Sequence, residues 1–296
     1  MRVEARGVGK RFGAVAALDD VCFEIPAGRR VALIGPNGSG KSTLNRILMG
    51  LLACEGEVRL DGRSPFRERV TIARRMAYVP QIAPQLRAPV GEVVRAVARV
   101  RGLAPAEVGR VAARLDLDLP ALGATPVANL SGGTKQKLLI SLALAARASL
   151  LVLDEPTGSL DAEARDRFFR LCDEVPSATT LLLCSHRLEE VRHLVDHVIA
   201  LRDGRLVHDG PSEAFVDSAT VCVIEVWVEP GVAPAWFEER GFRRAGGCWR
   251  LTTEPRGKLK LLAELTQALG PALRNVTVRD LERLDLSRLP GGARRD

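Results

Sequence analysis

The chain has 296 residues, a net charge of +7 and an ordinary apolar fraction of 46%. This length suits one large domain, or a domain of about 200 residues with a small one appended. No stretch approaches the roughly 18 uninterrupted apolar residues that a membrane-spanning helix needs. The first residues also lack the apolar core of a signal peptide. We therefore expect a soluble, cytoplasmic protein without a spanning helix.

The basic surplus and the cysteines bear on partners and compartment. A positive surface suits nucleic acid or the anionic inner leaflet of a membrane, although an Arg- and Ala-rich genome explains the same composition. The sequence shows no basic stripe interleaved with aromatic residues, no helix-turn-helix pattern and no zinc-ligand spacing, so no direct nucleic-acid binding is expected. The cysteines form no C-x-x-C pair, and several lie in apolar runs, which predicts buried free thiols in a reducing compartment. They are Cys22, Cys54, Cys172, Cys184, Cys222 and Cys248.

The first 28 residues predict strands joined by a turn. Apolar residues alternate from Val3 onward, and residues 15–18 and 21–25 continue the sheet before a Pro-Ala-Gly turn. Phe12 lies just before the second of these strands. Its ring could stack on an adenine, a contact worth about 1–3 kcal/mol by analogy with base stacking, or it could belong to the core.

A phosphate-binding loop follows the apolar run at residues 31–34. The pattern G-x-x-x-x-G-K-[ST] is formed by Gly35, Pro36, Asn37, Gly38, Ser39, Gly40, Lys41, Ser42 and Thr43. A strand precedes the loop and helical spacing follows it up to Gly50, which is the context that this motif requires. Glycines let the backbone amides point at phosphate oxygens, and the helix N-terminus adds positive charge. Lys41 can reach the β- and γ-phosphates and Ser42 can ligate Mg²⁺, so the loop predicts a site for a nucleoside triphosphate.

The next segments predict further sheet and then a change to helices. Residues 56–62 and 76–81 read as short strands, the second running into Gln81, and residues 67–75 between them read as a polar helix. From about residue 88 to 147 the apolar spacing becomes helical, with prolines breaking the region into pieces. This change indicates a helical subdomain, at about residues 84–147, inserted in an α/β core.

A second candidate anion site lies at residues 130–133, Leu-Ser-Gly-Gly. Ser131 is suited to cap the following helix, and Gly132 and Gly133 leave backbone amides free at its start. Capping alone also explains a Ser-Gly-Gly before a helix. The sequence leaves both interpretations open at this point.

Charged residues follow two fully apolar runs. Residues 150–153 lead to Asp154 and Glu155, and residues 181–184 lead through Ser185 to His186. Asp154 is placed as a second Mg²⁺ anchor, and Glu155 one residue farther could orient or deprotonate a water. Since the carboxyl ends of parallel strands meet at the ligand-binding edge of a sheet, Gln81 and these acids and histidine are expected to gather there.

Three other polar residues have simpler interpretations. Asp161 closes the turn after the acids, where it could merely cap the next helix. His193 and His197 are four residues apart on an expected helix and could ligate a metal. Without a third ligand nearby, we favour a solvated helix face for the two histidines.

The pattern resets after residue 210. A hairpin at residues 198–207 with an Asp-Gly turn ends the first domain. Beyond it, strands are expected at 220–228, within 242–251 and at 273–278, with helices at 236–240 and 258–269. This βαββαβ order predicts a small α+β ferredoxin-like domain at 219–288, followed by a loose tail at 289–296. No catalytic constellation is visible in this part.

Taken together, residues 1–210 strongly resemble the ATPase subunit of an ABC (ATP-binding cassette) transporter. The motifs that carry the resemblance occur in the family's order: the phosphate loop at 35–43, the Q-loop glutamine Gln81, the Leu-Ser-Gly-Gly signature at 130–133, the acids Asp154 and Glu155, the D-loop at 159–161, and the switch histidine His186. The resemblance implies a P-loop NTPase fold of class α/β, with an antiparallel β subdomain and a helical subdomain. Phe12 stands where the family more often has Tyr, and Thr134 where it more often has Gln; neither departure implies an inactive enzyme.

The resemblance also implies a mechanism. Two such domains pair head to tail as a homodimer, and each ATP lies between one subunit's phosphate loop and the other's signature residues Ser131, Gly132 and Gly133. Glu155 would be the general base, Gln81 would touch Mg²⁺ and the attacking water, His186 would contact the γ-phosphate, and Asp161 of the D-loop would belong to the nucleotide-binding residues. Hydrolysis would move a separate membrane permease, which places the protein on the inner face of the cell membrane.

Narrower resemblances suggest a direction of transport. The C-terminal segment resembles the tail of ABC-2-type exporter ATPases, and residues 183–186 more weakly resemble ATPases of the nitrous-oxide-reductase maturation type. Export, or maturation of an extracytoplasmic enzyme, is therefore expected. The alternative from another class is a soluble ABC ATPase acting on nucleic acid or ribosomes, although such proteins usually carry two cassettes or a long coiled-coil insertion. The C-terminal domain could act as a ligand sensor that gates the ATPase, or as a dimerisation or docking module.

Overall fold

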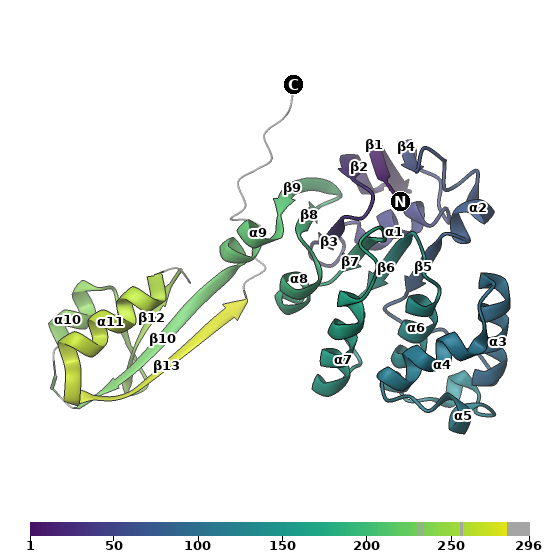
Figure 1. Cartoon of the computed structure of the whole chain (residues 1–296). Coiled ribbons are helices and arrows are strands. Elements are labelled where there is room, and N and C mark those ends of the chain that lie inside the picture. The colour runs from purple at the N-terminus through teal and green to yellow at the C-terminus, as the bar shows by residue number, and fades with distance from the viewer. Residues whose placement is uncertain (230, 233, 255–256, 283–296) are drawn as a thin grey trace. The chain divides into compact units, whose positions relative to one another are not determined.

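The computed structural model describes residues 1–229, 231–232, 234–254 and 257–282 (Figure 1). The tail expected at 289–296 lies outside these residues. The chain forms two compact units, one comprising Met1–Ser212 and one beginning at Glu213. Among the helices of the described residues, none is long and apolar enough to cross a membrane.

A six-stranded sheet forms the centre of the first unit. Its strand order is β5-β6-β7-β3-β8-β9, with β9 antiparallel to β8 and every other pair parallel. The strands are β3 (Arg30–Ile34), β5 (Met76–Val79), β6 (Leu150–Asp154), β7 (Thr180–Cys184), β8 (His197–Arg202) and β9 (Arg205–Pro211). The central strands are apolar at successive residues because helices and a second sheet cover both faces, as is usual for parallel sheets.

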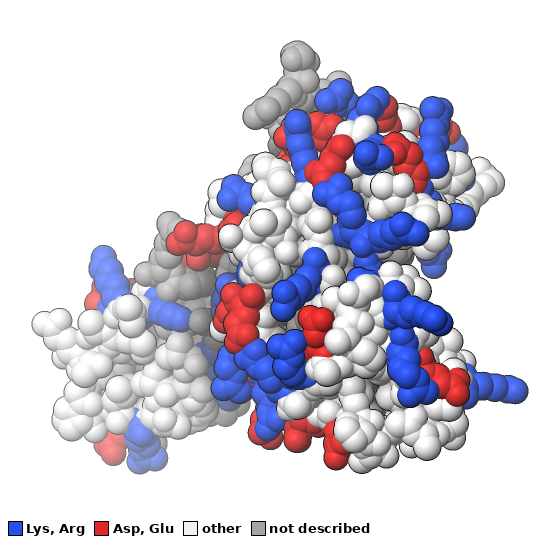
Figure 2. All heavy atoms as spheres, turned by 45° about the vertical axis from the view of Figure 1, so that its right-hand side comes forward, with Lys and Arg blue, Asp and Glu red and all other residues white. Residues whose placement is uncertain are grey.

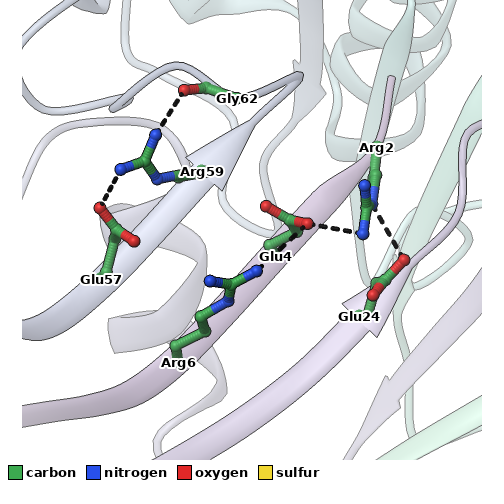
Figure 3. A network of polar contacts seen from close by, with 7 residues as sticks. All are labelled: Arg2, Glu4, Arg6, Glu24, Glu57, Arg59 and Gly62. Atoms are coloured by element: carbon green, nitrogen blue, oxygen red, sulfur yellow. Dashed lines mark hydrogen bonds and ion pairs between the residues drawn. The ribbon is translucent and has the colours of Figure 1, made fainter.

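A three-stranded antiparallel sheet, β2-β1-β4, packs on this centre. It consists of β1 (Val3–Phe12), β2 (Val15–Ile25) and β4 (Glu55–Leu60), and its inward residues share one apolar core with Leu33 and Ile199 of the central sheet. On its outer face Arg2 bridges Glu4 and Glu24 at 2.7 and 2.9 Å, while Arg59 pairs with Glu57 at 2.7 Å (Figure 3). Exposed pairs of this kind contribute at most about 1 kcal/mol each, so burial of the inner face holds this sheet in place.

Between β5 and β6 the chain forms the expected helical subdomain. Its helices are α3 (Val90–Arg101), α4 (Pro105–Arg114), α5 (Leu119–Leu122) and α6 (Gly132–Ala145), with a 3₁₀ turn at Val127–Asn129. Val94, Val108, Leu138 and their neighbours form a separate apolar core. The half-buried guanidinium of Arg101 donates to the carbonyl oxygens of Arg74 (2.9 Å) and Met76, which ties α3 to the start of β5.

The remaining helices of the first unit flank the sheet. They are α1 (Lys41–Leu48), α2 (Arg69–Ala73), α7 (Ala162–Asp173) and α8 (Leu188–Leu194) (Figure 1). The helix expected at residues 67–75 is present as α2, which is shorter and covers Arg69–Ala73.

One helix expectation is wrong. His193 lies on α8 and stacks on Phe169 with ring centroids 4.8 Å apart, whereas His197 begins β8 and its Nε2 lies 2.6 Å from Asp209 Oδ1. The helix ends because Val195 is extended and the apolar residues after it pair with β3. Strand pairing here overrides the helical spacing, and the two histidines do not share a helix face.

The second unit has the expected βαββαβ order. Its elements are β10 (Thr220–Val228), α10 (Pro234–Glu239), β11 (Arg243–Ala245), β12 (Cys248–Thr253), α11 (Lys258–Leu269) and β13 (Leu273–Glu282), preceded by α9 (Ser212–Ala219). The antiparallel order β11-β12-β10-β13 is that of a ferredoxin-like sheet. Phe237, Phe242 and Trp249 pack with Ile224 and Leu265 in its core.

All six cysteines are free thiols, and four of them are buried as expected. Burial raises the pKa of the Cys184 thiol to about 12 and raises that of Cys172 as well, so both stay protonated at neutral pH. Cys22 is exposed and Cys54 is partly buried.

Candidate nucleotide-binding site

The phosphate loop joins β3 to α1 with a backbone that only glycine can follow at two points. A Cβ atom on Gly35 would lie 2.3 Å from the Leu201 carbonyl oxygen, and one on Gly40 would lie 2.5 Å from the Ala17 carbonyl oxygen. Gly40 caps α1 at φ 102°, a left-handed conformation that glycine adopts without strain. The loop leads directly into the N-terminus of an eight-residue helix, whose free backbone amides favour an anion.

Two side chains of this loop are set up for polar contacts. Lys41 Nζ donates to the carbonyl oxygens of Gly35 at 2.5 Å and Pro36 at 3.0 Å, so its ammonium lies over the loop. Ser39 is 2% exposed, and its Oγ has no hydrogen-bond partner in the described part of the chain. Asn37, Gly38 and Ser42 are exposed. The loop thus presents an ammonium group and a buried hydroxyl around its glycines.

The sheet brings four predicted positions to one edge. Register pairs Val79 with Leu153, Asp154 with Cys184, and Cys184 with Leu33, so the carboxyl ends of β5, β6, β7 and β3 are level. Gln81, the two acids, His186 and the phosphate loop follow these strands in that spatial order. The expected gathering of the catalytic candidates at one sheet edge is present.

Asp154 ends β6 in a partly buried position. Its Oδ2 accepts a hydrogen bond from the Tyr78 hydroxyl at 3.2 Å. Burial raises the pKa of Asp154, and Glu155 adds to the rise, whereas Tyr78 and Lys41 oppose it. The Lys41 ammonium is thus close enough to lower the pKa of the Asp154 carboxyl. Burial also raises the pKa of Tyr78, which remains a neutral donor.

Glu155 is held in a strained conformation beside His186. Its φ is 48°, and its backbone N–H donates to the Cys184 carbonyl at 2.8 Å. Glu155 Oε1 lies 2.8 Å from His186 Nδ1, while its buried Oε2 has no partner among the described residues. The His186 side chain is 68% exposed. The pair thus offers a free carboxylate oxygen next to an imidazole that can share a proton.

The signature residues begin α6 away from the phosphate loop. Ser131 Oγ accepts from the Thr134 N–H at 3.2 Å, so the capping interpretation holds. Ser131 and Gly132 are exposed, and a Cβ on Gly133 would lie 2.9 Å from the Ser159 carbonyl oxygen. Within the described ranges, no hydrogen bond or ion pair joins residues 131–133 to residues 35–43. The exposed start of α6 is therefore a second candidate anion site, not joined to the phosphate loop by these interactions.

The two remaining candidates have defined surroundings. Asp161 caps α7, its Oδ1 accepting from the Ala164 N–H at 2.8 Å. Phe12 is 49% exposed, with Lys10 Nζ 5.6 Å from its ring centroid, so the ring is not a core residue.

Sequence reasoning missed several polar residues that support this edge. Gln136 Nε2 donates to the Pro156 carbonyl at 2.9 Å, and Asn45 Nδ2 lies 3.0 Å from Cys184 Sγ. Tyr78, the only tyrosine of the chain, holds Asp154. A polar residue in an otherwise apolar pattern could have revealed them: Asn45 and Gln136 lie on the buried faces of helices, and Tyr78 lies in an apolar strand.

The oxygen donors here fit Mg²⁺. The hydroxyl of Ser42, the carboxylate of Asp154 and the side-chain carbonyl of Gln81 are the hard ligands that this ion prefers. No group of three or more His, Cys, Asp or Glu side chains able to hold a metal occurs in the described residues.

Comparisons with known proteins agree with this geometry. Residues 18–158 match the ABC transporter family. The chain is 36% identical over 234 residues to the sulfate/thiosulfate import ATP-binding protein CysA of Caulobacter vibrioides, covering 73% of this chain and 69% of that one. It is 34% identical to the Nod factor export ATP-binding protein I of Cupriavidus metallidurans, covering 76% of each.

A solved structure of the ATP-binding subunit of an ABC transporter is also similar. It superposes with a TM-score of 0.65 at 29% identity, over 71% of this chain and 90% of that chain. The identity, the coverage and the site together show that the chain belongs to the ABC transporter family as an ATP-binding subunit and is an ATPase.

Proposed function

We propose that two copies of the chain bind two ATP molecules head to tail and thereby drive a separate membrane permease. The observation that carries this proposal is that the two candidate anion sites are not joined within the described part of one chain. Ser131 and Gly132 are exposed at the start of α6. Among the described residues, no backbone hydrogen bond joins residues 131–133 to the loop at 35–43. A second copy would bring a signature to each phosphate loop.

The residues of the edge take the following roles. The loop amides and Lys41 bind the β- and γ-phosphates, and Phe12 stacks on the base. Ser42, Asp154 and Gln81 would hold Mg²⁺, which when bound neutralises charge on the phosphate oxygens. The partner's signature residues, with Asp161 nearby, complete the site.

Hydrolysis needs a base for one proton. Glu155 accepts the proton of a water whose oxygen forms a bond to the γ-phosphorus, while the bond from that phosphorus to the β-γ bridging oxygen breaks. The products are ADP and inorganic phosphate, and the bond electrons leave with ADP. His186, hydrogen-bonded to Glu155 Oε1, holds the carboxylate in place and contacts the γ-phosphate.

Exposed apolar side chains support a permease contact near Gln81. Ile82 is 79% exposed, Leu86 40% and Val100 75%, all in the segment that follows β5. Phe66 (54%) and Val70 (69%) are exposed just before that strand. Exposed large apolar side chains are available for contact with a partner protein. We expect a cytoplasmic subunit, peripheral on the inner face of the membrane through this contact.

Surface charge does not favour the nucleic-acid alternative. On the face shown in Figure 2, acidic side chains are interspersed among the basic ones across the first unit. The chain carries 36 Asp and Glu against 43 Lys and Arg, so the surplus is small for its size. The face shown therefore lacks a continuous basic stripe of the kind that binds nucleic acid.

For direction we propose export or maturation of an extracytoplasmic enzyme, on the resemblance of the C-terminal segment. The relatives include proteins named for export of Nod factor and for import of sulfate or iron. Identity in the ATP-binding unit is therefore compatible with either direction.

The test is the oligomeric state of Glu155→Gln protein with saturating ATP, measured by light scattering after size exclusion. This substitution removes the base and should slow turnover about 10²- to 10⁴-fold, so that an ATP-bound dimer accumulates. Adding Ser131→Arg to the same chain should abolish that dimer, because it places bulk and charge at the signature. A Glu155→Gln chain that binds ATP and stays monomeric contradicts the proposal. Co-purification with a multi-spanning protein from host membranes, rather than with ribosomes, tests the permease.

A further inference from the structure

A carboxyl group that the mechanism above does not use lies buried next to the catalytic pair. Glu190, in the first turn of α8, is 0% exposed. Burial raises the pKa of its carboxyl, and one oxygen, Oε2, has no hydrogen-bond partner within the described ranges. Removing an ionisable carboxyl from water is costly, and an apolar side chain of similar volume is often neutral or better for stability. Stability alone therefore does not account for a glutamate here.

The contacts of Glu190 join two loops. The Thr157 hydroxyl donates to Glu190 Oε1, and the Ser185 hydroxyl lies beside the same carboxyl. Thr157 is two residues after Glu155, and Ser185 immediately precedes His186. Thr157 is 0% exposed and Ser185 1% exposed, so water does not screen these contacts. The two loops that carry the proposed base and its histidine thus converge on one buried carboxyl.

The segment after Glu155 is also held from its other side. Gln136 of α6 donates to the Pro156 carbonyl at 2.9 Å, and the Leu160 N–H donates to the Thr157 carbonyl at 3.0 Å. Glu155 contacts His186, and the Thr157 hydroxyl donates to Glu190, four residues after His186, so the same two segments are joined a second time. Two contacts restrict the relative position of the two segments more than one contact does.

We propose that Glu190 is a positioning residue that fixes the geometry between Glu155 and His186 through Thr157 and Ser185. This inference rests on the proposed roles of Glu155 and His186. It assigns no contact with ATP to Glu190, so the residue acts on turnover and not on binding.

The experiment uses apolar replacements that preserve volume, in the full-length chain. Glu190→Leu alone leaves the Thr157 hydroxyl unpaired, and Thr157→Val alone deprives the carboxyl of one of its two hydroxyl partners, so each is expected to lower the melting temperature. The double variant removes both groups of the Thr157–Glu190 hydrogen bond and leaves Ser185, whose Oγ still accepts from the Arg187 N–H, so it should melt above either single variant. We nevertheless expect its kcat to fall at least about tenfold, since small displacements of catalytic groups are costly. Its KM for ATP should stay within about twofold.

Two further variants serve as controls. Thr157→Ser keeps the hydroxyl and should retain kcat within about threefold. Glu189→Gln alters the neighbouring carboxyl of the same helix, which is 45% exposed and pairs with Arg165 at 3.1 Å, and should leave kcat and KM unchanged.

The outcomes separate the two proposals. A double variant whose kcat recovers together with its stability overturns the positioning role, as does a Glu189→Gln variant that is equally slow. If Glu155→Gln itself hardly slows turnover, the proposed base is wrong and the failure lies there. If Glu155→Gln is inactive while the double variant is fully active, only the role of Glu190 is overturned.

Discussion

The two units of the chain treat buried polar side chains in opposite ways. In the first unit, oxygen atoms of Ser39, Asn45, Glu155 and Glu190 are buried without a hydrogen-bond partner among the described residues. In the second unit Glu225 is the one buried charged side chain of the described part, and both its oxygens are engaged: Arg250 donates to Oε1 at 2.9 and 2.6 Å, and Arg279 lies 3.6 Å from Oε2.

This difference indicates which unit contains the catalytic site. Unpaired buried polar atoms cost stability, so a fold keeps them where a ligand, a proton or a moving loop supplies the missing partner. Ser39 and Glu155 lie in the loops after β3 and β6, Asn45 contacts the last residue of β7, and Glu190 contacts the loop after β6. Among the described residues of the second unit, no buried side-chain oxygen or nitrogen atom lacks a hydrogen-bond partner. The comparison predicts that catalysis depends on the first unit alone.

The largest expected effect is on the stability of the second unit, and it tests whether catalysis is independent of that unit. Trp249 is 7% exposed and stacks on Phe237 at 4.9 Å, so Trp249→Ala should destabilise the second unit by about 3–5 kcal/mol. ATP turnover per molecule should stay within about twofold. Thermal unfolding followed by tryptophan fluorescence and a steady-state ATPase assay measure the two effects. A large change in turnover would instead mean that the second unit gates the ATPase.

The next effect concerns the charge over the phosphate loop. Lys41→Ala removes the ammonium that lies over Gly35 and Pro36, and turnover should fall about 10²- to 10³-fold, a loss of roughly 2.7–4 kcal/mol of transition-state stabilisation. Lys260→Ala deletes an exposed cation of the second unit and serves as the matched control. Equal activity of the two variants would contradict the assignment of phosphate binding to the loop.

A smaller effect is expected at the base-binding position. Phe12→Ala should raise the KM for ATP by about tenfold, because base stacking contributes about 1–3 kcal/mol, and should leave kcat nearly unchanged. Phe12→Tyr keeps the ring and should bind ATP as the parent does. Titration with a fluorescent ATP analogue measures the affinity directly. An unchanged affinity in Phe12→Ala would leave the exposed ring without a nucleotide role.

The smallest effect lies in the satisfied ion pairs of the second unit. Arg250 is 52% exposed, so water screens its pair with Glu225, and Arg250→Gln should cost less than about 1 kcal/mol of unfolding free energy. Urea denaturation of the full chain measures it. A loss greater than about 2 kcal/mol would show that Glu225 depends on this partner as a buried charge does, which would weaken the contrast between the units.

The sequence predicted the parts of the site that are local in the chain. A glycine-rich loop needs only its own residues to curl, and acids after an apolar run lie at a strand end whatever packs beside them. The parallel order of the sheet then brings Gln81, Asp154 and His186 together. The element order of both units was predictable for the same reason, since apolar periodicity and turn residues act over short distances.

Long-range contacts could not be predicted in this way. Tyr78 meets Asp154 across 76 positions, and Thr157 meets Glu190 across 33, so no local pattern signals either contact. His197 shows the reverse case, in which pairing with β3 turns an apparently helical stretch into a strand. For Glu190 the sequence does contain a signal, because its spacing of four residues from Leu194 places it on the apolar, buried side of α8.

The left-handed backbone at Glu155, with φ 48°, also limits the mutational routes open to this position. Single-base changes of a glutamate codon can produce Asp, Gly, Ala, Val, Lys or Gln. Gly suits the conformation best and Asp tolerates it, whereas the branched Val does not. We expect a saturation library scored for abundance to favour Gly and Asp and to deplete Val. Since Gly has no carboxylate and the carboxylate of Asp is one methylene shorter, the replacements that this backbone tolerates best would give folded chains that still bind ATP and no longer turn it over.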